Sequence, residues 1–298
     1  MKKFFVIWEW FGLPYTELRD GVRLFFEIRG EGPPLAMIEG WGYSRWMWFK
    51  QINHFSKKYT CIVFDNRGVG LSDKPDEPYS VELFADDLRE LLDHIGVSRA
   101  HILGISMGGF IAQKFALKYP GRVLSLILVS THFGGEKARQ TPKETMDAIL
   151  SIREEDLGAG EALKRKMSFA FNPKYFEENP EEIDQIISWR IEEAQPRYAW
   201  LRQAEAVQNF NLGNKASQIK APTLIVAGTN DRVVPHQNAE LLLETIPNSK
   251  LVLFEGGSHL LFIENADTFN KVVMEFLNEV DEGVFSTSKR KITINVKR

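Results

Sequence analysis

The sequence contains little cysteine, no long apolar run and little excess charge of either sign. Its single cysteine, Cys61, has no partner for an internal disulfide and lies in the apolar run TCIVFD, which is typical of a buried strand. No run approaches the roughly 18 apolar residues that a membrane-spanning helix needs. A formal net charge of -3 over 298 residues offers no broad positive field for nucleic acid or an anionic membrane. We therefore expect a small-molecule partner, no nucleic-acid or membrane partner, and a reducing, cytoplasmic location.

The first residues, MKKFFVIWEWFG, have two lysines ahead of an apolar patch, as many targeting segments do. Glu9 interrupts that patch, and no small-residue cleavage site follows it. We expect this stretch to remain in the mature protein.

Short β-rich runs alternate with helical patterns along most of the chain. The runs are at 23–28, 34–39, 61–65, 100–105, 124–130, 222–228 and 250–256, and the helical patterns are at 44–57, 80–95, 107–119, 236–246 and 265–280. Several runs are continuously apolar, which is typical of parallel strands buried on both faces. The pattern predicts an α/β fold with a mostly parallel sheet of about eight strands between helices, opened by an antiparallel hairpin.

The regular alternation of predicted strands and helices stops for about ninety residues, which contain four helical segments instead. These are near 142–152, 159–171, 180–194 and 197–209. We therefore predict a core made of 1–131 and 221–280, a helical cap (lid) at 132–220, and a basic tail at 281–298 that either is disordered or adds an edge strand. The aromatic and Met side chains of the cap are expected to form mostly its own small core, with pocket lining as the alternative.

The stretch GISMGG, residues 104–109, lies between an apolar strand and a helix. Its spacing matches neither phosphate-binding motif, because it has no Gly-Lys-Ser/Thr ending and no Gly-x-Gly-x-x-Gly. Gly104-x-Ser106-x-Gly108 does match the nucleophile elbow, in which a strained turn lifts a serine out of the sheet. The elbow lies at the carboxyl end of a central strand, where ligands bind in open α/β sheets.

A serine nucleophile needs a base, and that base needs an acid to orient it. His259 follows the final predicted strand on a Gly-Gly-Ser loop, and Asp231 follows the strand before it. Ser106, Asp231 and His259 therefore occur in the order nucleophile, acid, base on successive strand ends. His132 is the nearest rival as base, and the remaining histidines are expected to be structural.

Acyl transfer also needs hydrogen-bond donors for the oxyanion. Met107 begins the helix after Ser106, so its backbone N–H is a candidate that the helix dipole assists. The second donor is expected from the glycine-containing stretch EGWGYS, residues 39–44, and Trp41 is the predicted residue.

The motifs DNRGVGLSD (65–73), GISMGGFIAQKFALKYPGRV (104–123), AGTNDRVVP (227–235) and GGSHLLFIENADTFN (256–270) resemble those of α/β-hydrolases. The resemblance covers roughly residues 20–280 and is to the lid-bearing esterase and lactonase type. It implies a serine carboxylesterase with no metal or organic cofactor, acting on a small acyl ester.

Several alternatives within the same fold are disfavoured by single residues. Dehalogenases and epoxide hydrolases of this fold have aspartate at the elbow, whereas this chain has Ser106. Carbon–carbon bond hydrolases tend to have tryptophan after the histidine, whereas this chain has Leu260. A lactonase or an acyl thioesterase, and from another class a non-catalytic binding module, stay open. The sequence also leaves the oligomeric state open.

The chain departs from the family pattern at Glu39, where a histidine is usual. We expect Glu39 to replace that histidine's hydrogen bonds to nearby backbone. The sharper hypothesis is that it raises the pKa of His259. Arg67 is expected to belong to a self-supporting loop rather than to clamp a substrate carboxylate.

Overall fold

A nine-stranded sheet organises the molecule. The computed structural model describes residues 14–152, 157–286 and 290–295. Within these ranges the strand order is β1-β2-β4-β3-β5-β6-β7-β8-β9, with antiparallel pairing of β2 to β1 and to β4 and parallel pairing elsewhere. The strands are β1 (Tyr15–Glu17), β2 (Arg23–Arg29), β3 (Pro34–Ile38), β4 (Thr60–Phe64), β5 (Ala100–Ile105), β6 (Val123–Val129), β7 (Thr223–Gly228), β8 (Ser249–Glu255) and β9 (Arg290–Asn295). The predicted α/β class with a mostly parallel sheet is confirmed.

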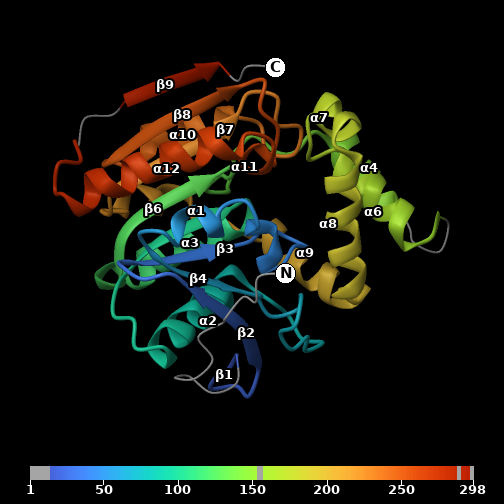
Figure 1. Ribbon diagram of the computed structural model, residues 1–298, viewed down its shortest axis with the longest axis horizontal. Helices are drawn as coiled ribbons and strands as arrows, with labels where there is room; N and C mark the ends of the chain where they lie inside the picture. Colours follow the sequence, from blue (N-terminus) through green and yellow to red (C-terminus); the bar gives the residue numbers. More distant parts are fainter. Residues whose placement is uncertain (1–13, 153–156, 287–289, 296–298) are drawn as a thin grey trace.

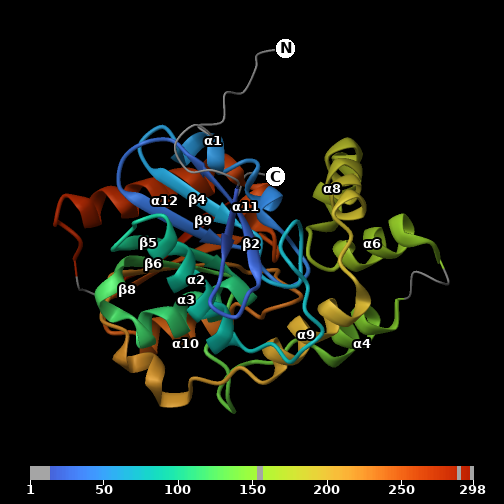
Figure 2. The same cartoon turned by 90° about the horizontal axis from the view of Figure 1, so that it is seen from below.

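Helices cover both faces of this sheet, as Figure 2 shows. One face carries α1 (Ile52–Phe55), α11 (Leu261–Glu264) and α12 (Ala266–Asp281), and the other carries α2 (Val81–His94), α3 (Met107–Lys118) and α10 (Gln237–Thr245). Side chains of β5 alternate between the two resulting cores, with Ile102 in one and Leu103 in the other. Burial on both faces explains why the strand sequences are continuously apolar.

The segment between β6 and β7 is helical. It comprises α4 (Lys143–Ser151), α6 (Ala159–Ser168), α7 (Pro173–Glu178), α8 (Pro180–Glu192), α9 (Arg197–Gln208) and the 3-10 turn η3 (Gly213–Gln218). Figure 1 shows these helices beside the sheet, at the side to which the parallel strands point. Four of them correspond to predicted segments, and α7 is an additional helix. No helix within the described ranges has the length and apolar character needed to cross a bilayer.

The opening of the sheet differs from the expected hairpin. The first two predicted strands, β2 and β3, are not neighbours, because β4 lies between them. Gly30 and Gly32 both have positive φ, and they let the connection from β2 to β3 pass against the backbone of residues 56–59, just before β4. The sheet does open with an antiparallel hairpin, but β1 and β2 form it, and β3 pairs in parallel with β4.

The predicted helix at 44–57 is also divided in the structure. A 3-10 turn, η1 (Arg45–Trp48), and the short helix α1 replace it. At the break, Lys50 and Gln51 donate hydrogen bonds to the backbone carbonyls of Ile263 and Phe262, at 3.2 and 2.7 Å. These tertiary contacts set the backbone where the sequence pattern alone indicated one continuous helix. A further 3-10 turn, η2 (Pro120–Arg122), follows α3.

The basic tail contributes a strand at the sheet edge. Residues Arg290–Asn295 pair in parallel with β8 as β9, and Lys291 forms an ion pair with Glu240 of α10. Val296, which belongs to the predicted alternating pattern, and the N-terminal stretch MKKFFVIWEWFG lie outside the described residues.

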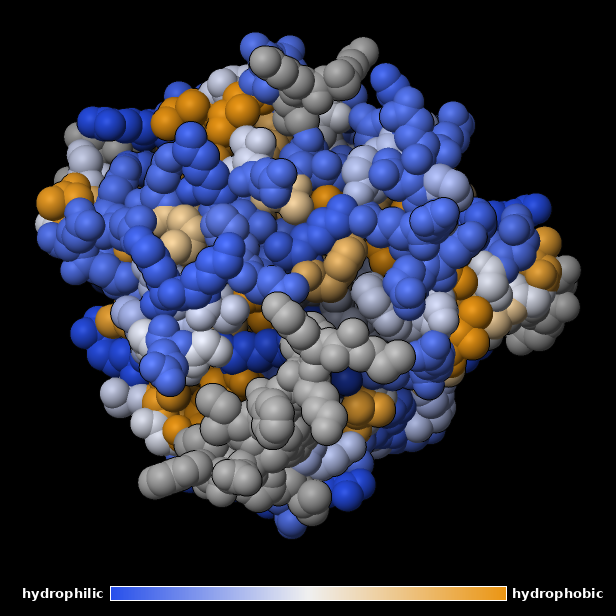
Figure 3. Space-filling view, in the orientation of Figure 1, coloured by the Kyte–Doolittle hydropathy of each residue, from blue (hydrophilic) through white to orange (hydrophobic). Residues whose placement is uncertain are grey.

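The surface is mostly polar. Among the described residues, the exposed large apolar side chains are Leu71, Ile191, Tyr198, Leu201, Val284 and Ile292. The face seen in Figure 3 is accordingly largely hydrophilic, with apolar residues in scattered groups.

Two glycines allow α3 to lie unusually close to the sheet. A Cβ on Gly104 would lie 2.2 Å from the carbonyl oxygen of Gly108, and one on Gly108 would lie 2.2 Å from that of Ile38. Both obstacles are backbone atoms, which cannot rotate away as a side chain can. The contact between β3, β5 and α3 therefore requires glycine at both positions.

We expect Gly108→Ala to lower the free energy of unfolding by about 1–3 kcal/mol or more, because the added methyl group overpacks a backbone contact. Gly121→Ala is the matched control, because a Cβ there meets nothing within 4 Å. Denaturant unfolding of both variants measures the difference. Equal stability of the two variants would contradict this account of the contact.

Candidate active site

Ser106 is the residue that joins β5 to α3. Its φ of 53° and ψ of -116° lie in a region that L residues rarely adopt. Such strain costs on the order of 1–3 kcal/mol and persists only where the surroundings enforce it. The Thr131 hydroxyl donates to the Ser106 carbonyl at 2.8 Å, and the glycine contacts of α3 fix the turn from the other side. The serine is thereby held partly exposed at the carboxyl edge of the sheet, and it lines a pocket there.

His259 and Asp231 meet on neighbouring loops. His259 Nδ1 lies 2.8 Å from Asp231 Oδ2, and the aspartate side chain is fully buried. Its other oxygen, Oδ1, accepts the backbone N–H groups of Val233 and Val234, each at 2.8 Å. Because both carboxylate oxygens are engaged, Asp231 has one orientation and can hold the imidazole in one orientation.

The loop that carries His259 is fixed from two further sides. Ser130, at the end of β6, donates its hydroxyl to the His259 carbonyl at 3.1 Å. The Leu260 N–H donates to the carbonyl of Ala170 in the lid segment at 3.0 Å. The ring of His259 is therefore positioned by the sheet and by the lid segment together.

One pocket is lined by Ser106, His259 and Trp41, whereas Asp231 and Met107 are not among its lining residues. The surrounding wall is mostly apolar. The wall also includes Gly40, Trp41, Tyr43, Met47, Ile105, Phe110, His132, Thr141, Met146, Ile149, Lys166, Ala170, Arg190, Trp200, Val207, Val233, Val234 and Leu260. Met146 and Trp200 come from the set of lid aromatic and Met residues that we expected to form a separate small core. Met167 and Phe171, from the same set, are buried, but in a cluster that they share with strand residues such as Leu103 rather than in a separate core of the cap.

The stretch at residues 39–44, which we call the oxyanion loop, runs beside the serine. A Cβ on Gly40 would lie 3.4 Å from the Ser106 Cβ, so the two backbones are in close contact there. Within the described part of the chain, the backbone N–H groups of Trp41 and Met107 have no hydrogen-bond acceptor. Both predicted donors are thus next to the serine and available to an oxygen atom bound there.

His132, the rival base, lines the same pocket but has a different environment. Burial lowers its pKa to about 4, so the ring is neutral at physiological pH. Its Nδ1 accepts the Gly134 N–H at 3.0 Å, and its ring lies against Phe110 with the centroids 4.5 Å apart. His259 differs in having a carboxylate partner, which is what a catalytic base requires.

Glu39 is fully buried and accepts the backbone N–H of Asn66 at 2.8 Å. This is the replacement hydrogen bond to nearby backbone that we expected. Burial, with a smaller contribution from the neighbouring Asp65 carboxylate, raises the pKa of Glu39 well above its ordinary value. The surroundings of Glu39 therefore favour its protonated form.

Arg67 belongs to the structure of its own loop. Its guanidinium is almost fully buried and donates to Asp87 and Asp20, each at 2.7 Å. It is not among the residues that line the serine pocket.

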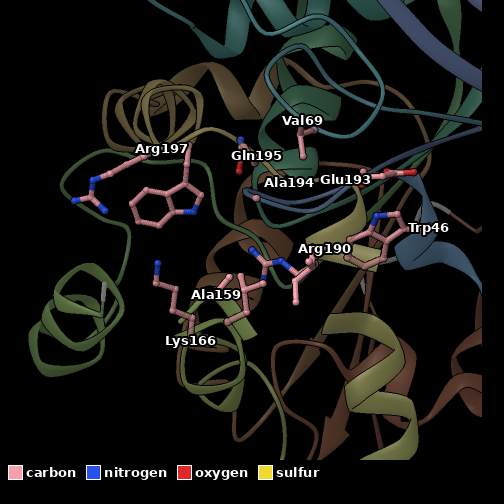
Figure 4. A pocket seen from close by; sticks show the side chains of 14 residues that line it. Trp46, Val69, Ala159, Lys166, Arg190, Glu193, Ala194, Gln195 and Arg197 are labelled. Carbon is pink, nitrogen blue, oxygen red and sulfur yellow. Dashed lines mark hydrogen bonds between the residues drawn. The ribbon is translucent and has the colours of Figure 1, made fainter. Parts of the chain in front are cut away.

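An outer pocket adjoins the serine pocket. Lys166, Arg190 and Trp200 line both of them, so these side chains form the boundary between the two. Figure 4 shows the outer pocket, with Lys166 on one side and Gln195 on the opposite side. The outer pocket is more polar than the serine pocket, with Glu193 and Arg197 also in its wall.

The oxyanion loop makes contacts with the lid that the sequence analysis missed. The Trp41 ring packs against Trp200 of α9 at a tilt of 32°, with ring centroids 4.3 Å apart, and the Gly42 N–H donates to Gln203 Oε1 at 3.1 Å. A single glutamine within a helical pattern carries no sequence signal for such a role. Within the described residues, no group of three or more His, Cys, Asp or Glu side chains is arranged to hold a metal ion.

Comparisons with known proteins show the family to which the chain belongs. The model of the alpha/beta hydrolase fold family matches residues 33–266. The chain is 27% identical to RutD of Azorhizobium caulinodans, a protein named as a carbamate hydrolase, over 91% of this chain and 100% of that protein. It is 31% identical to the 2-hydroxy-6-oxononadienedioate/2-hydroxy-6-oxononatrienedioate hydrolase 2 of Pseudomonas putida, over 89% of this chain and 91% of that protein. The crystal structure of the enol-lactonase from Burkholderia xenovorans matches with a TM-score of 0.80 and 26% identity, over 89% of this chain and 100% of that chain.

The raised pKa of Glu39 generates a prediction about stability. Above its ordinary value of 4.5, the folded state keeps a proton that the unfolded state releases, so the contribution of Glu39 to stability falls as the pH rises. Glutamine does not titrate. We expect the unfolding free energy of Glu39→Gln, relative to wild type, to rise by up to about 1.4 kcal/mol per pH unit above pH 4.5 and to be flat below it. Urea unfolding of both proteins from pH 4 to 8 measures this, and a difference independent of pH would mean that Glu39 is ionised in the fold.

Proposed function

Because this chain belongs to the alpha/beta hydrolase family and is a hydrolase, we propose that it cleaves carboxylic esters through a serine acyl-enzyme. The observation that carries the proposal is the pocket that contains Ser106 and His259, with His259 hydrogen-bonded to the buried Asp231 at 2.8 Å. No metal or organic cofactor takes part in the proposed reaction.

In the first step, His259 accepts the Ser106 proton as the serine oxygen attacks the ester carbonyl. Asp231 holds Nδ1–H of the imidazole, so Nε2 is the nitrogen that takes the proton, and the buried carboxylate stabilises the imidazolium that forms. Protonated His259 then gives its proton to the departing alcohol. Water repeats the sequence on the acyl-enzyme and releases the acid.

The negative charge on the carbonyl oxygen is expected to be bound by the N–H groups of Trp41 and Met107. Both lie beside Ser106 without a protein acceptor among the described residues, and Met107 is the first residue of α3. The positive end of the helix dipole therefore adds to the hydrogen bond from Met107. Loss of one such donor typically costs on the order of a hundredfold or more in rate.

The apolar wall of the serine pocket supports an ester with an apolar acyl or alcohol group. Lactone hydrolysis is the second candidate, because the enol-lactonase similar in structure is named for acting on a cyclic ester. Carbon–carbon bond cleavage, which other members of this fold perform, is disfavoured by Leu260, which occupies the position after His259 on the pocket wall.

We expect Ser106→Ala to lower ester hydrolysis by at least about a thousandfold, because the nucleophile is lost. The melting temperature should stay close to that of the wild type, because the side chain is partly exposed and alanine keeps the Cβ. A fluorophosphonate should label the wild type once, at Ser106, and fail to label the variant, as peptide mass spectrometry would measure. Ser217→Ala, at an exposed serine of η3, is the control and should behave as wild type. Turnover retained by Ser106→Ala would refute the assignment of the nucleophile.

A substrate panel separates the alternatives. We expect kcat/KM for p-nitrophenyl esters of graded acyl length to exceed kcat/KM for lactones, acyl thioesters, carbamates and dienedioate carbon–carbon substrates, because the pocket wall is apolar and Leu260 follows His259. Higher kcat/KM for a lactone would establish the second candidate. Higher kcat/KM for the carbon–carbon substrate would overturn ester cleavage as the main activity.

A further inference from the structure

We propose that Gln203 of lid helix α9 is a positioning residue that sets the oxyanion loop for catalysis. The proposal rests on the proposed function, because it concerns the loop from which Trp41 offers its backbone N–H. It assigns to the lid a part in building the site, in addition to covering it.

Gln203 links the lid to the oxyanion loop through its side-chain amide. The residue is fully buried, and its Oε1 accepts the Gly42 N–H at 3.1 Å across 161 positions of sequence. Its Nε2 donates to the carbonyl of Arg67 at 3.2 Å, and Oε1 also accepts Gln195 Nε2 at 3.1 Å. The amide is therefore held at both ends, so the position of its oxygen is fixed relative to the core.

A second contact fixes the same loop one residue earlier. The Trp41 indole lies against Trp200 with ring centroids 4.3 Å apart, and its Nε1–H donates to the Trp200 carbonyl at 2.9 Å. The backbone N–H of Trp41 thus lies between two contacts with α9. One is made by its own side chain and the other by the N–H of Gly42.

The loop needs such anchors because its own backbone is permissive. Gly42 has a φ of 76°, Gly40 has no side chain, and the Trp41 N–H has no protein acceptor among the described residues that would hold it in place. An oxyanion donor acts only if it is aimed before the charge develops, and a misplacement of about 1 Å can cost on the order of a hundredfold in rate. The loop's own bond, from the Tyr43 N–H to the Gly40 carbonyl at 3.2 Å, spans the turn, and the bond from Gly42 to Gln203 fixes that turn against the lid.

The principal variant is Gln203→Met, which keeps the side-chain volume and removes the acceptor. We expect kcat to fall by about tenfold or more with KM nearly unchanged, because the loop matters most in the transition state. The affinity for a boronic acid, whose tetrahedral adduct on Ser106 places an oxygen at the oxyanion site, should fall by the same factor. Rates are expressed per active site, titrated with the fluorophosphonate.

Two further variants separate positioning from simple stabilisation of the lid. Tyr198→Phe removes a different hydrogen bond from α9 to the core, the 2.7 Å bond to the Lys74 carbonyl, and should leave kcat and boronic acid affinity unchanged. Gln203→Glu retains an acceptor for Gly42 but loses the donor to the Arg67 carbonyl, so it should restore part of the activity lost in Gln203→Met. If Gln203→Met unfolds, Trp41→Phe tests the second anchor, because it retains the backbone N–H and an aromatic ring against Trp200 but loses the Nε1 bond.

Amide hydrogen exchange of the peptide containing residues 39–44 provides a readout independent of activity. We expect faster exchange in Gln203→Met than in Tyr198→Phe or wild type. If the wild type fails to react with the fluorophosphonate, the proposed function fails, and the exchange measurement alone decides whether Gln203 holds the loop. Unchanged exchange in Gln203→Met, or equal kcat and boronic acid affinity in Gln203→Met and Tyr198→Phe, would overturn the inference.

Discussion

The contact between Gly108 of α3 and the end of β3 is the constraint on which the rest of the site depends. A Cβ on Gly108 would lie 2.2 Å from the Ile38 carbonyl oxygen and 2.7 Å from that of Glu39, so only a hydrogen atom fits there. The helix that begins directly after Ser106 is thereby seated against the start of the oxyanion loop. One backbone contact thus strains the serine turn and brings the loop with Trp41 beside it.

The loops that carry Asp231 and His259 are also brought together by a close glycine contact. A Cβ on Gly228, at the end of β7, would lie 2.2 Å from the Gly257 carbonyl oxygen, on the loop after β8. Close approach of these two loops brings Asp231 within 2.8 Å of His259. The parallel sheet places all four loops at one edge, and the missing side chains at Gly108 and Gly228 bring them together in pairs. Strain at Ser106 is tolerated because packing on both faces of the sheet enforces it.

The sequence predicts those features whose cause is local. Apolar runs identify the buried strands because both faces of the sheet are covered, and Gly104 reflects a contact with Gly108, only four residues further along the chain. The glycine at 108 itself is required by the distant Ile38 carbonyl. Prediction from the sequence fails where contacts between distant segments determine the structure. β4 separates β2 from β3. Lys50 and Gln51 lie at the break in a predicted helix and bind carbonyls more than two hundred residues away. Gln203 falls in the second group, because nothing near it in the sequence distinguishes it from any helical glutamine.

The lid segment forms hydrogen bonds with both the oxyanion loop and the histidine loop, so the boundary between lid and core in the sequence does not separate two independent structures. In the sequence, the end of the alternating strand and helix pattern marks where the chain leaves the sheet. Hydrogen bonds nonetheless cross that boundary to the oxyanion loop, through Gln203 and Trp200, and to the histidine loop, where Ala170 accepts from Leu260 and from the Ser258 hydroxyl. Separating the lid from the core would leave these buried groups unpaired, at about 1–3 kcal/mol each where water cannot replace the partner. The geometry of the site is therefore a joint property of lid and core, although the two are distinct stretches of chain.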